Sequence, residues 1–313
     1  MGKKKFTGVS QFLARFRGWI QAGAALLTNL HLPNFLKGGL YQGAGKTVCV
    51  PGLNCYSCPA ASGACPIGAF QAVVGSSKFS FSYYITGILI LLGVLLGRFI
   101  CGFLCPFGWF QELLHKIPSR KLSTRKLKPL RYLKYAILLV MVFLLPAFLV
   151  NDVGMGDPFF CKYLCPQGVL EGAIPLSLAN SGIRAALGSL FTWKFGILLV
   201  VIVLSVLFYR PFCKWICPLG AFYALLNKVS LVQMKVDQSK CISCGKCARA
   251  CKMDVDVTKS PNHTECIRCG MCVRACPTNA VRFRCGFGTG KQGTVLPEKT
   301  NKQMNDIVKE KKS

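Results

Sequence analysis

Acidic and histidine side chains are scarce in this sequence of 313 residues, which contains 11 Asp and Glu and 3 His. With only His31, His115 and His263 present, we do not expect a membrane haem held by two histidines. A complete phosphate-binding loop is also missing. Gly43-Ala-Gly-Lys-Thr47 looks like the end of one, but Leu40 stands where the first glycine belongs. The sequence therefore predicts neither of these two sites.

The few acids face 39 Lys and Arg, which give a net charge of +28 although 52% of the residues are hydrophobic and the mean hydropathy is +0.42. The charges are separated from the apolar runs, as in a polytopic membrane protein with basic loops on one side. Nucleic-acid binding is the other reading of a basic chain. We reject it because the basic residues flank apolar runs instead of forming a soluble patch.

Uncharged apolar runs predict the membrane spans, at about 18–36, 79–97, 135–151 and 190–209. The basic loop 98–134 and the segment after Arg210 are then cytoplasmic, and loops 37–78 and 152–194 lie outside. A cleaved signal peptide is the alternative for the first run. We prefer an uncleaved span because Asn29, His31 and Pro33 interrupt the run and no convincing cleavage site follows.

The phrase Cys-Pro-x-Gly occurs four times among the 19 cysteines. Three copies carry a second thiol four residues upstream, so both thiols share one face of a helical turn. These pairs are Cys101 and Cys105, Cys161 and Cys165, and Cys213 and Cys217. The fourth copy begins at Cys65, with Cys55 and Cys58 upstream at another spacing. Proline suits the start of a new helix, whose positive end would favour an anionic iron–sulfur cluster.

Each half of the membrane region reads as an outer Cys-Pro motif, a span and an inner Cys-Pro motif, from Cys65 to Cys105 and from Cys165 to Cys217. This order predicts two parallel half-repeats about an axis along the membrane normal. The expected fold is a mainly α membrane protein with four transmembrane helices and a small C-terminal α+β two-cluster ferredoxin domain. The expected boundaries are 1–235 for the membrane domain, 236–285 for the ferredoxin domain and 286–313 for a basic, disordered tail.

The segment after Val236 contains two runs of the form Cys-x2-Cys-x2-Cys-x3-Cys, which resemble the bacterial two-cluster ferredoxins. In that pattern the fourth cysteine of each run serves the other cluster. The resemblance implies one [4Fe–4S] cluster on Cys241, Cys244, Cys247 and Cys276, and another on Cys266, Cys269, Cys272 and Cys251. Lys252 replaces the proline that usually follows the fourth cysteine. Structural zinc is the alternative, but zinc sites usually pair two Cys-x2-Cys knuckles across a longer gap.

The membrane thiols are paired by the side on which they are expected. Cys101, Cys105, Cys213 and Cys217 are all on the inner side and can complete one cluster. On the outer side, Cys161 and Cys165 should join Cys65 and one further thiol, with Cys58 or Cys55 ahead of Cys49. A disulfide between two of the outer thiols is the alternative to a cluster there. Cys285 is expected to be an inert thiol. Glu171 is expected to be an interfacial acid, with a proton relay for quinol as the alternative.

With these motifs the chain, from about residue 18 to residue 285, resembles the NapH-type membrane polyferredoxins, which are related to NosR- and RdxA-like proteins. The resemblance implies electron transfer in a prokaryotic cytoplasmic membrane, with both termini cytoplasmic, serving a partner reductase or the quinone pool. Two features depart from the family. The outer loop carries extra cysteines, and the flavin-attachment motif of NosR-like proteins is missing.

We expect an electron-transfer subunit without a substrate-turnover site of its own, containing two clusters in the ferredoxin domain and one or two in the membrane domain. The expected partners are membrane lipid, a redox protein and, as a candidate, quinone. A maturation factor that reduces a metalloenzyme during assembly is an alternative, as is a transmembrane thiol–disulfide relay. Clusters on opposite faces of a hydrocarbon core about 30 Å thick would be too far apart for one hop. Either the motifs dip inward, or another cofactor fills the gap.

Overall fold

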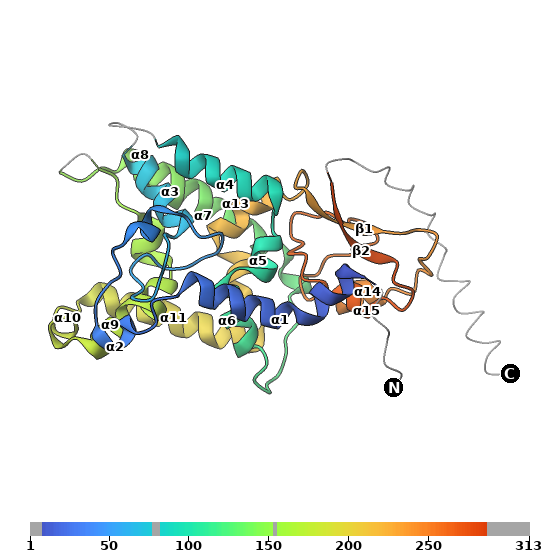
Figure 1. Ribbon diagram of the computed structural model, residues 1–313, viewed down its shortest axis with the longest axis horizontal. Helices are drawn as coiled ribbons and strands as arrows, with labels where there is room; N and C mark the ends of the chain where they lie inside the picture. The colour runs from blue at the N-terminus through green and yellow to red at the C-terminus, as the bar shows by residue number, and fades with distance from the viewer. Residues whose placement is uncertain (1–7, 77–81, 153–154, 287–313) are drawn as a thin grey trace.

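The computed structural model describes residues 8–76, 82–152 and 155–286, and these are mostly helical (Figure 1). Their elements, in chain order, are α1 (Val9–Thr28), α2 (Asn34–Lys37), η1 (Ala44–Thr47), α3 (Pro66–Gly75), α4 (Tyr83–Leu95), α5 (Phe99–Phe103), α6 (Pro106–Leu114), η2 (Arg125–Tyr132), α7 (Leu133–Ile137), η3 (Leu138–Leu144), α8 (Leu145–Phe148), η4 (Phe160–Leu164), η5 (Gly168–Ala173), α9 (Ile174–Ala179), α10 (Ser181–Ala185), α11 (Ser189–Leu207), α12 (Pro211–Trp215), α13 (Pro218–Leu226), β1 (Val232–Val236), α14 (Lys246–Ala250), α15 (Met271–Ala275) and β2 (Val281–Cys285). The expected disordered tail lies outside the described residues, apart from Gly286.

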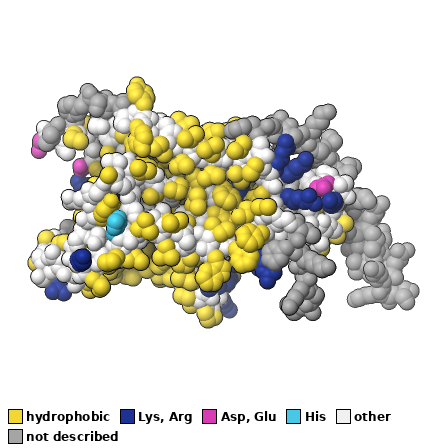
Figure 2. Space-filling view, in the orientation of Figure 1, with side chains coloured by type: hydrophobic (Ala, Val, Ile, Leu, Met, Phe, Trp, Pro, Cys, Tyr) yellow, Lys and Arg dark blue, Asp and Glu magenta, His cyan; other side chains and the backbone are white. Residues whose placement is uncertain are grey.

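Two helical stretches of the described chain, Leu127–Phe148 and Ser189–Leu207, are long and apolar enough to cross a membrane. On α11, Leu199, Val200 and Val203 are 47%, 57% and 58% exposed. In Figure 2 hydrophobic side chains cover much of the visible helical surface, and Lys and Arg gather towards the end formed by the strands. Apolar surface exposed on this scale fits contact with lipid or another apolar partner.

The first helix lies nearer the N-terminus than the predicted span 18–36. The side chains of Thr28 and Asn29 donate hydrogen bonds to the carbonyls of Ala24 and Ala25, and the helix ends at Thr28. The second predicted span, 79–97, starts in residues that are not described. Its helix α4 has 13 residues, a length of about 20 Å. The number of membrane crossings therefore stays a prediction.

The C-terminal part forms a small module of two strands and two short helices at one end of the molecule (Figure 1). Strand β1 pairs with β2 in antiparallel register, from Val232 opposite Cys285 to Val236 opposite Val281. Ala14 of α1 packs into the core of this module. Gly270 makes this approach possible, since it has a φ of 75° and a Cβ atom there would lie 2.6 Å from the Cβ of Ala14. We call residues 232–285 the ferredoxin-like module.

The core of the helical part lies where the Cys-Pro motifs meet. It contains buried rings from four separate helices: Phe70, Phe107, Phe160 and Phe212. The rings of Phe107 and Phe212 meet edge to face with centroids 5.0 Å apart. The same core contains cysteines of all four motifs, so the predicted cluster ligands are packed in apolar surroundings.

Candidate functional site

The three complete Cys-Pro motifs share one local structure. Their first cysteine lies in a short helical turn, α5, η4 or α12, and the second follows one or two residues after the end of that turn. Proline then begins the next helix in α6 and α13, as it also does in α3 after Cys65. The expectation that proline starts a new helix is thus confirmed at Cys65, Cys105 and Cys217.

The thiols that we call the inner set come together from α5, α12 and the turns after them. The members of the inner set are Cys101, Cys105, Cys213 and Cys217. Burial, and then the neighbouring thiols of Cys213 and Cys101, raise the pKa of Cys105 to about 12. Such thiols stay protonated at neutral pH unless a bound metal takes the place of the proton.

Two fully buried arginines connect the two motifs of the inner set. Arg98 donates to the carbonyl of Cys213 at 3.4 Å, and Arg210 donates to the carbonyl of Cys101. Each arginine lies three residues before the first cysteine of its own motif. The two motifs therefore hold one another reciprocally and place two positive charges beside the four thiols.

The outer set gathers thiols from loop 49–65 and from η4, and its fourth member is Cys55 rather than Cys58. A Cβ atom on Gly168 would lie 3.7 Å from Sγ of Cys55, and one on Gly68 would lie 3.7 Å from Sγ of Cys161. Burial raises the pKa of Cys165 well above its usual value. Three neighbouring thiols raise that pKa further: those of Cys161, Cys55 and Cys65. These four residues are the outer set.

The remaining outer thiols have other surroundings. Cys58 is buried against Ala60 and Ala61, and its Sγ lies 3.6 Å from Oδ1 of Asn29. Cys49 forms a backbone bridge with Ala64. Both are free thiols, like all other cysteines of the described chain.

The module holds two further sets of four thiols. One hollow is lined by the four cysteines that the ferredoxin pattern assigns to one cluster, which we call the distal set: Cys241, Cys244, Cys247 and Cys276. In the proximal set, burial raises the pKa of Cys272 well above its usual value. Three neighbouring thiols raise this pKa further: Cys266, Cys269 and Cys251. Cys285 is exposed at the end of β2.

A polar residue six positions after each Cys-Pro cysteine belongs to these sites, and our sequence analysis missed three of the four. Gln71 donates to Sγ of Cys161 at 3.2 Å, and Gln111 donates to Sγ of Cys213 at 3.1 Å. The carboxylate of Glu171 accepts from the backbone N–H of Cys55 at 3.0 Å. Tyr223 donates to the carbonyl of Pro51 at 3.0 Å. The constant offset of six was a signal that aligning the four copies could have found.

The sets follow one another through direct backbone contacts. A Cβ atom on Gly102, inside the Cys101 motif, would lie 2.3 Å from the carbonyl oxygen of Ile267 and 3.7 Å from Cα of Cys269. At the other side of the inner set, a Cβ atom on Gly52 would lie 2.7 Å from Cα of Cys105. The outer loop therefore dips into the helical part and reaches the inner set.

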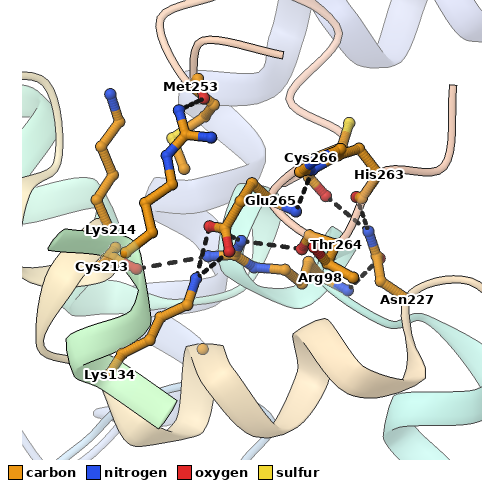
Figure 3. A network of polar contacts seen from close by, with 12 residues as sticks. Arg98, Lys134, Cys213, Lys214, Asn227, Met253, His263, Thr264, Glu265 and Cys266 are labelled. Atoms are coloured by element: carbon orange, nitrogen blue, oxygen red, sulfur yellow. Dashed lines mark hydrogen bonds and ion pairs between the residues drawn. The ribbon is translucent and has the colours of Figure 1, made fainter. Parts of the chain in front are cut away.

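Buried ion pairs fix the module against the helical part (Figure 3). The carboxylate of Glu265 lies between Arg98, at 2.9 Å, and Lys134, at 2.5 Å. A second pair joins Asp254 of the module to Lys214 of α12 at 3.1 Å. Arg98 thus contacts both Glu265, the residue before Cys266, and the carbonyl of Cys213.

Each set contains four thiols, the number of Cys ligands that a [4Fe–4S] cluster takes. No group of three Cys, His, Asp or Glu side chains in the described segments is arranged to hold one metal ion. The inner set also has spare donors nearby, because Nε of Arg98 and Nη2 of Arg210 are buried without a hydrogen-bond partner. Such N–H groups fit an anionic iron–sulfur cluster, whose sulfur atoms accept hydrogen bonds.

Comparisons with known proteins agree with this chemistry. A family described as a 4Fe-4S binding domain matches residues 63–84, 80–125, 134–174 and 190–237. A second family with the same description matches residues 234–255 and 260–282 of the module. No solved structure matches the chain significantly.

The curated relatives include two proteins named as ferredoxin-type. Ferredoxin-type protein NapH of Haemophilus influenzae is 28% identical over 193 residues, which cover 48% of this chain and 66% of the relative. Methylamine utilization ferredoxin-type protein MauN of Methylorubrum extorquens is 27% identical over 198 residues, which cover 61% of this chain and 56% of the relative. An uncharacterized protein of Methanocaldococcus jannaschii is 28% identical over 182 residues, which cover 55% of this chain and 66% of the relative. The chain spans less than two thirds of the length of each of these relatives. With its 4Fe-4S binding domains, the chain belongs to the NapH-type polyferredoxins.

Proposed function

We propose that the protein carries electrons between its ferredoxin-like module and the outer set of thiols, through the inner set. The residues that would hold four [4Fe–4S] clusters are Cys241, Cys244, Cys247 and Cys276 (distal), Cys251, Cys266, Cys269 and Cys272 (proximal), Cys101, Cys105, Cys213 and Cys217 (inner), and Cys55, Cys65, Cys161 and Cys165 (outer). Bound clusters would supply one-electron chemistry over a wide range of potentials.

The observation that carries this proposal is the contact between the outer loop and the inner set. Gly52 touches Cys105, and Cys55 is the third residue after Gly52 along the chain. The Cα atoms of Cys55 and Cys105 are therefore at most about 16 Å apart, even with that segment fully extended. This limit is about half the thickness of a hydrocarbon core. The inward loop supports a direct path between the outer and inner sets.

The junction with the module is shorter still. The contact of Gly102 with Cys269 limits the Cα distance between Cys101 and Cys269 to about 9 Å. The order of sites is then distal, proximal, inner and outer. We further propose that the helical part spans a cytoplasmic membrane with both termini inside, and that a redox protein and the quinone pool are the partners at its two ends.

Iron and acid-labile sulfide per chain test the proposal, on protein purified in detergent without oxygen. We expect about 16 iron atoms, four for each of four cubes. Cys217→Ala should lose about four of them and keep both cluster signals of the module. Cys285→Ser, the matched control, should lose none. About 8 iron atoms in the unmodified protein would restrict clusters to the module and contradict an electron path through the helical part.

A further inference from the structure

The distal set lies beneath an exposed edge of the module. The hollow formed by its cysteines is also lined by Ile242, Ser243 and Thr258. Ile242 is 63% exposed, a high value for an aliphatic side chain beside a candidate redox site. The proximal set, in contrast, faces the helical part through Ile267 and Cys269. The distal edge is thus the side of the module through which a soluble protein could approach.

Cations dominate the charge on the outside of the module. Within the described residues 232–286, the most exposed charged residues are all cations: Lys235, Lys240, Lys246, Arg249, Lys252, Lys259, Arg274 and Arg282. The carboxylate of Asp237, whose side chain is 36% exposed, lies 4.0 Å from Lys240. Two of the four acids of the module, Asp254 and Glu265, pair with cations of the helical part. These internal pairs leave the outward surface strongly positive.

Three of these lysines adjoin the distal hollow in the chain. Lys240 precedes Cys241, Lys246 precedes Cys247, and Lys259 follows Thr258. Arg249 is not counted with these lysines, because its guanidinium donates to the carbonyl of Cys244 at 3.0 Å and so stabilises the loop that contains Cys244. The distal edge therefore combines an exposed apolar residue with a basic rim, the usual composition of an interface with a polar periphery.

We propose that this distal edge, formed by Lys240, Ile242, Lys246 and Lys259, binds an acidic soluble protein that carries a one-electron redox group. The inference rests on the proposed function, since it assigns the soluble partner of the same electron path. One electron crosses between the two proteins, and no covalent bond forms or breaks. Charge complementarity would steer the encounter and raise the association rate by about 10- to 1,000-fold at low salt.

The test measures binding of oxidised flavodoxin, a small acidic flavoprotein, to the full-length, cluster-loaded protein in detergent. We expect the dissociation constant to rise at least about tenfold between 50 and 200 mM salt, because screening weakens exposed charge pairs. The variant K240E/K246E/K259E should bind at least about tenfold more weakly at low salt. The matched variant K116E/R120E/K128E makes the same change in net charge on exposed residues of the helical part, and it should bind within about twofold of the unmodified protein.

Equal weakening by both triple variants would overturn the proposal, because it would mean attraction to the net charge and not to this edge. Equally tight binding of a basic carrier, cytochrome c, would overturn it as well. Reduction by methyl viologen radical, a small cation that needs no docking surface, separates the two proposals. Normal iron content and normal viologen reduction with no binding of flavodoxin would reject only the docking edge. If the unmodified protein had no reducible clusters in its helical part, the electron path would be rejected. The flavodoxin-binding result would still test the docking edge by itself.

Discussion

Replacing Glu265 with alanine should loosen the ferredoxin-like module from the helical part. Burial alone would raise the pKa of Glu265, but Arg98 and then Lys134 lower it to about 2, so this carboxylate is ionised at neutral pH. Both cations have side chains that are 0% exposed. Removing one partner of a buried ion pair costs about 3–5 kcal/mol, because an uncompensated charge stays buried. That loss corresponds to a rise of about 10²- to 4 × 10³-fold in the undocked population.

Native-state hydrogen exchange of residues 232–285, compared between Glu265→Ala and the unmodified protein, measures this population. The double variant Glu265→Ala with Lys134→Ala should recover part of the protection, since it leaves one buried cation instead of two. Asp237→Ala is the control. Its partner Lys240 is 4.0 Å away and half exposed, so solvent screens this pair and hydrogen exchange should stay close to that of the unmodified protein. An increase in exchange below about threefold for Glu265→Ala would refute the view that this network fixes the module.

Three further experiments test single positions. Gly102→Ala places a Cβ atom 2.3 Å from the carbonyl oxygen of Ile267; we expect a loss of about 1–3 kcal/mol, measured as faster proteolysis of the module, and unchanged cleavage would contradict the close approach. Cys55→Ala should lose about four iron atoms and Cys58→Ala none, and the reverse result would exchange these two residues in the outer set. Gln111→Leu leaves a buried backbone N–H of α12 without its acceptor, which should cost about 1–3 kcal/mol of stability in thermal unfolding; no change in the melting temperature would show that water replaces the side chain.

The sequence predicted best what local spacing controls. The helix starts at Pro106 and Pro218 follow from contacts within a few residues. The distal cysteines, which line one hollow, follow from the spacing of two ferredoxin-like runs, because Cys276 comes from the second run. The choice between Cys55 and Cys58 could not be predicted in this way, because it depends on the path of a loop that no regular element fixes. The end of the first helix was missed for a related reason. The bonds of Thr28 and Asn29 to preceding carbonyls end it before the apolar run is complete.

The position six residues after each Cys-Pro cysteine occurs four times in the chain and carries different side chains, so its copies can be compared within one protein. The same turn is followed by an amide at Gln71 and Gln111, a carboxylate at Glu171 and a phenol at Tyr223. Three different chemical groups thus occupy the same sequence position after the Cys-Pro phrase, and each makes a different polar contact. Exchanging Gln71 and Glu171 would transpose an amide and an acid between the two motifs that share the outer set. Such an exchange keeps both residue types in the protein and changes only which thiol or backbone N–H each one contacts.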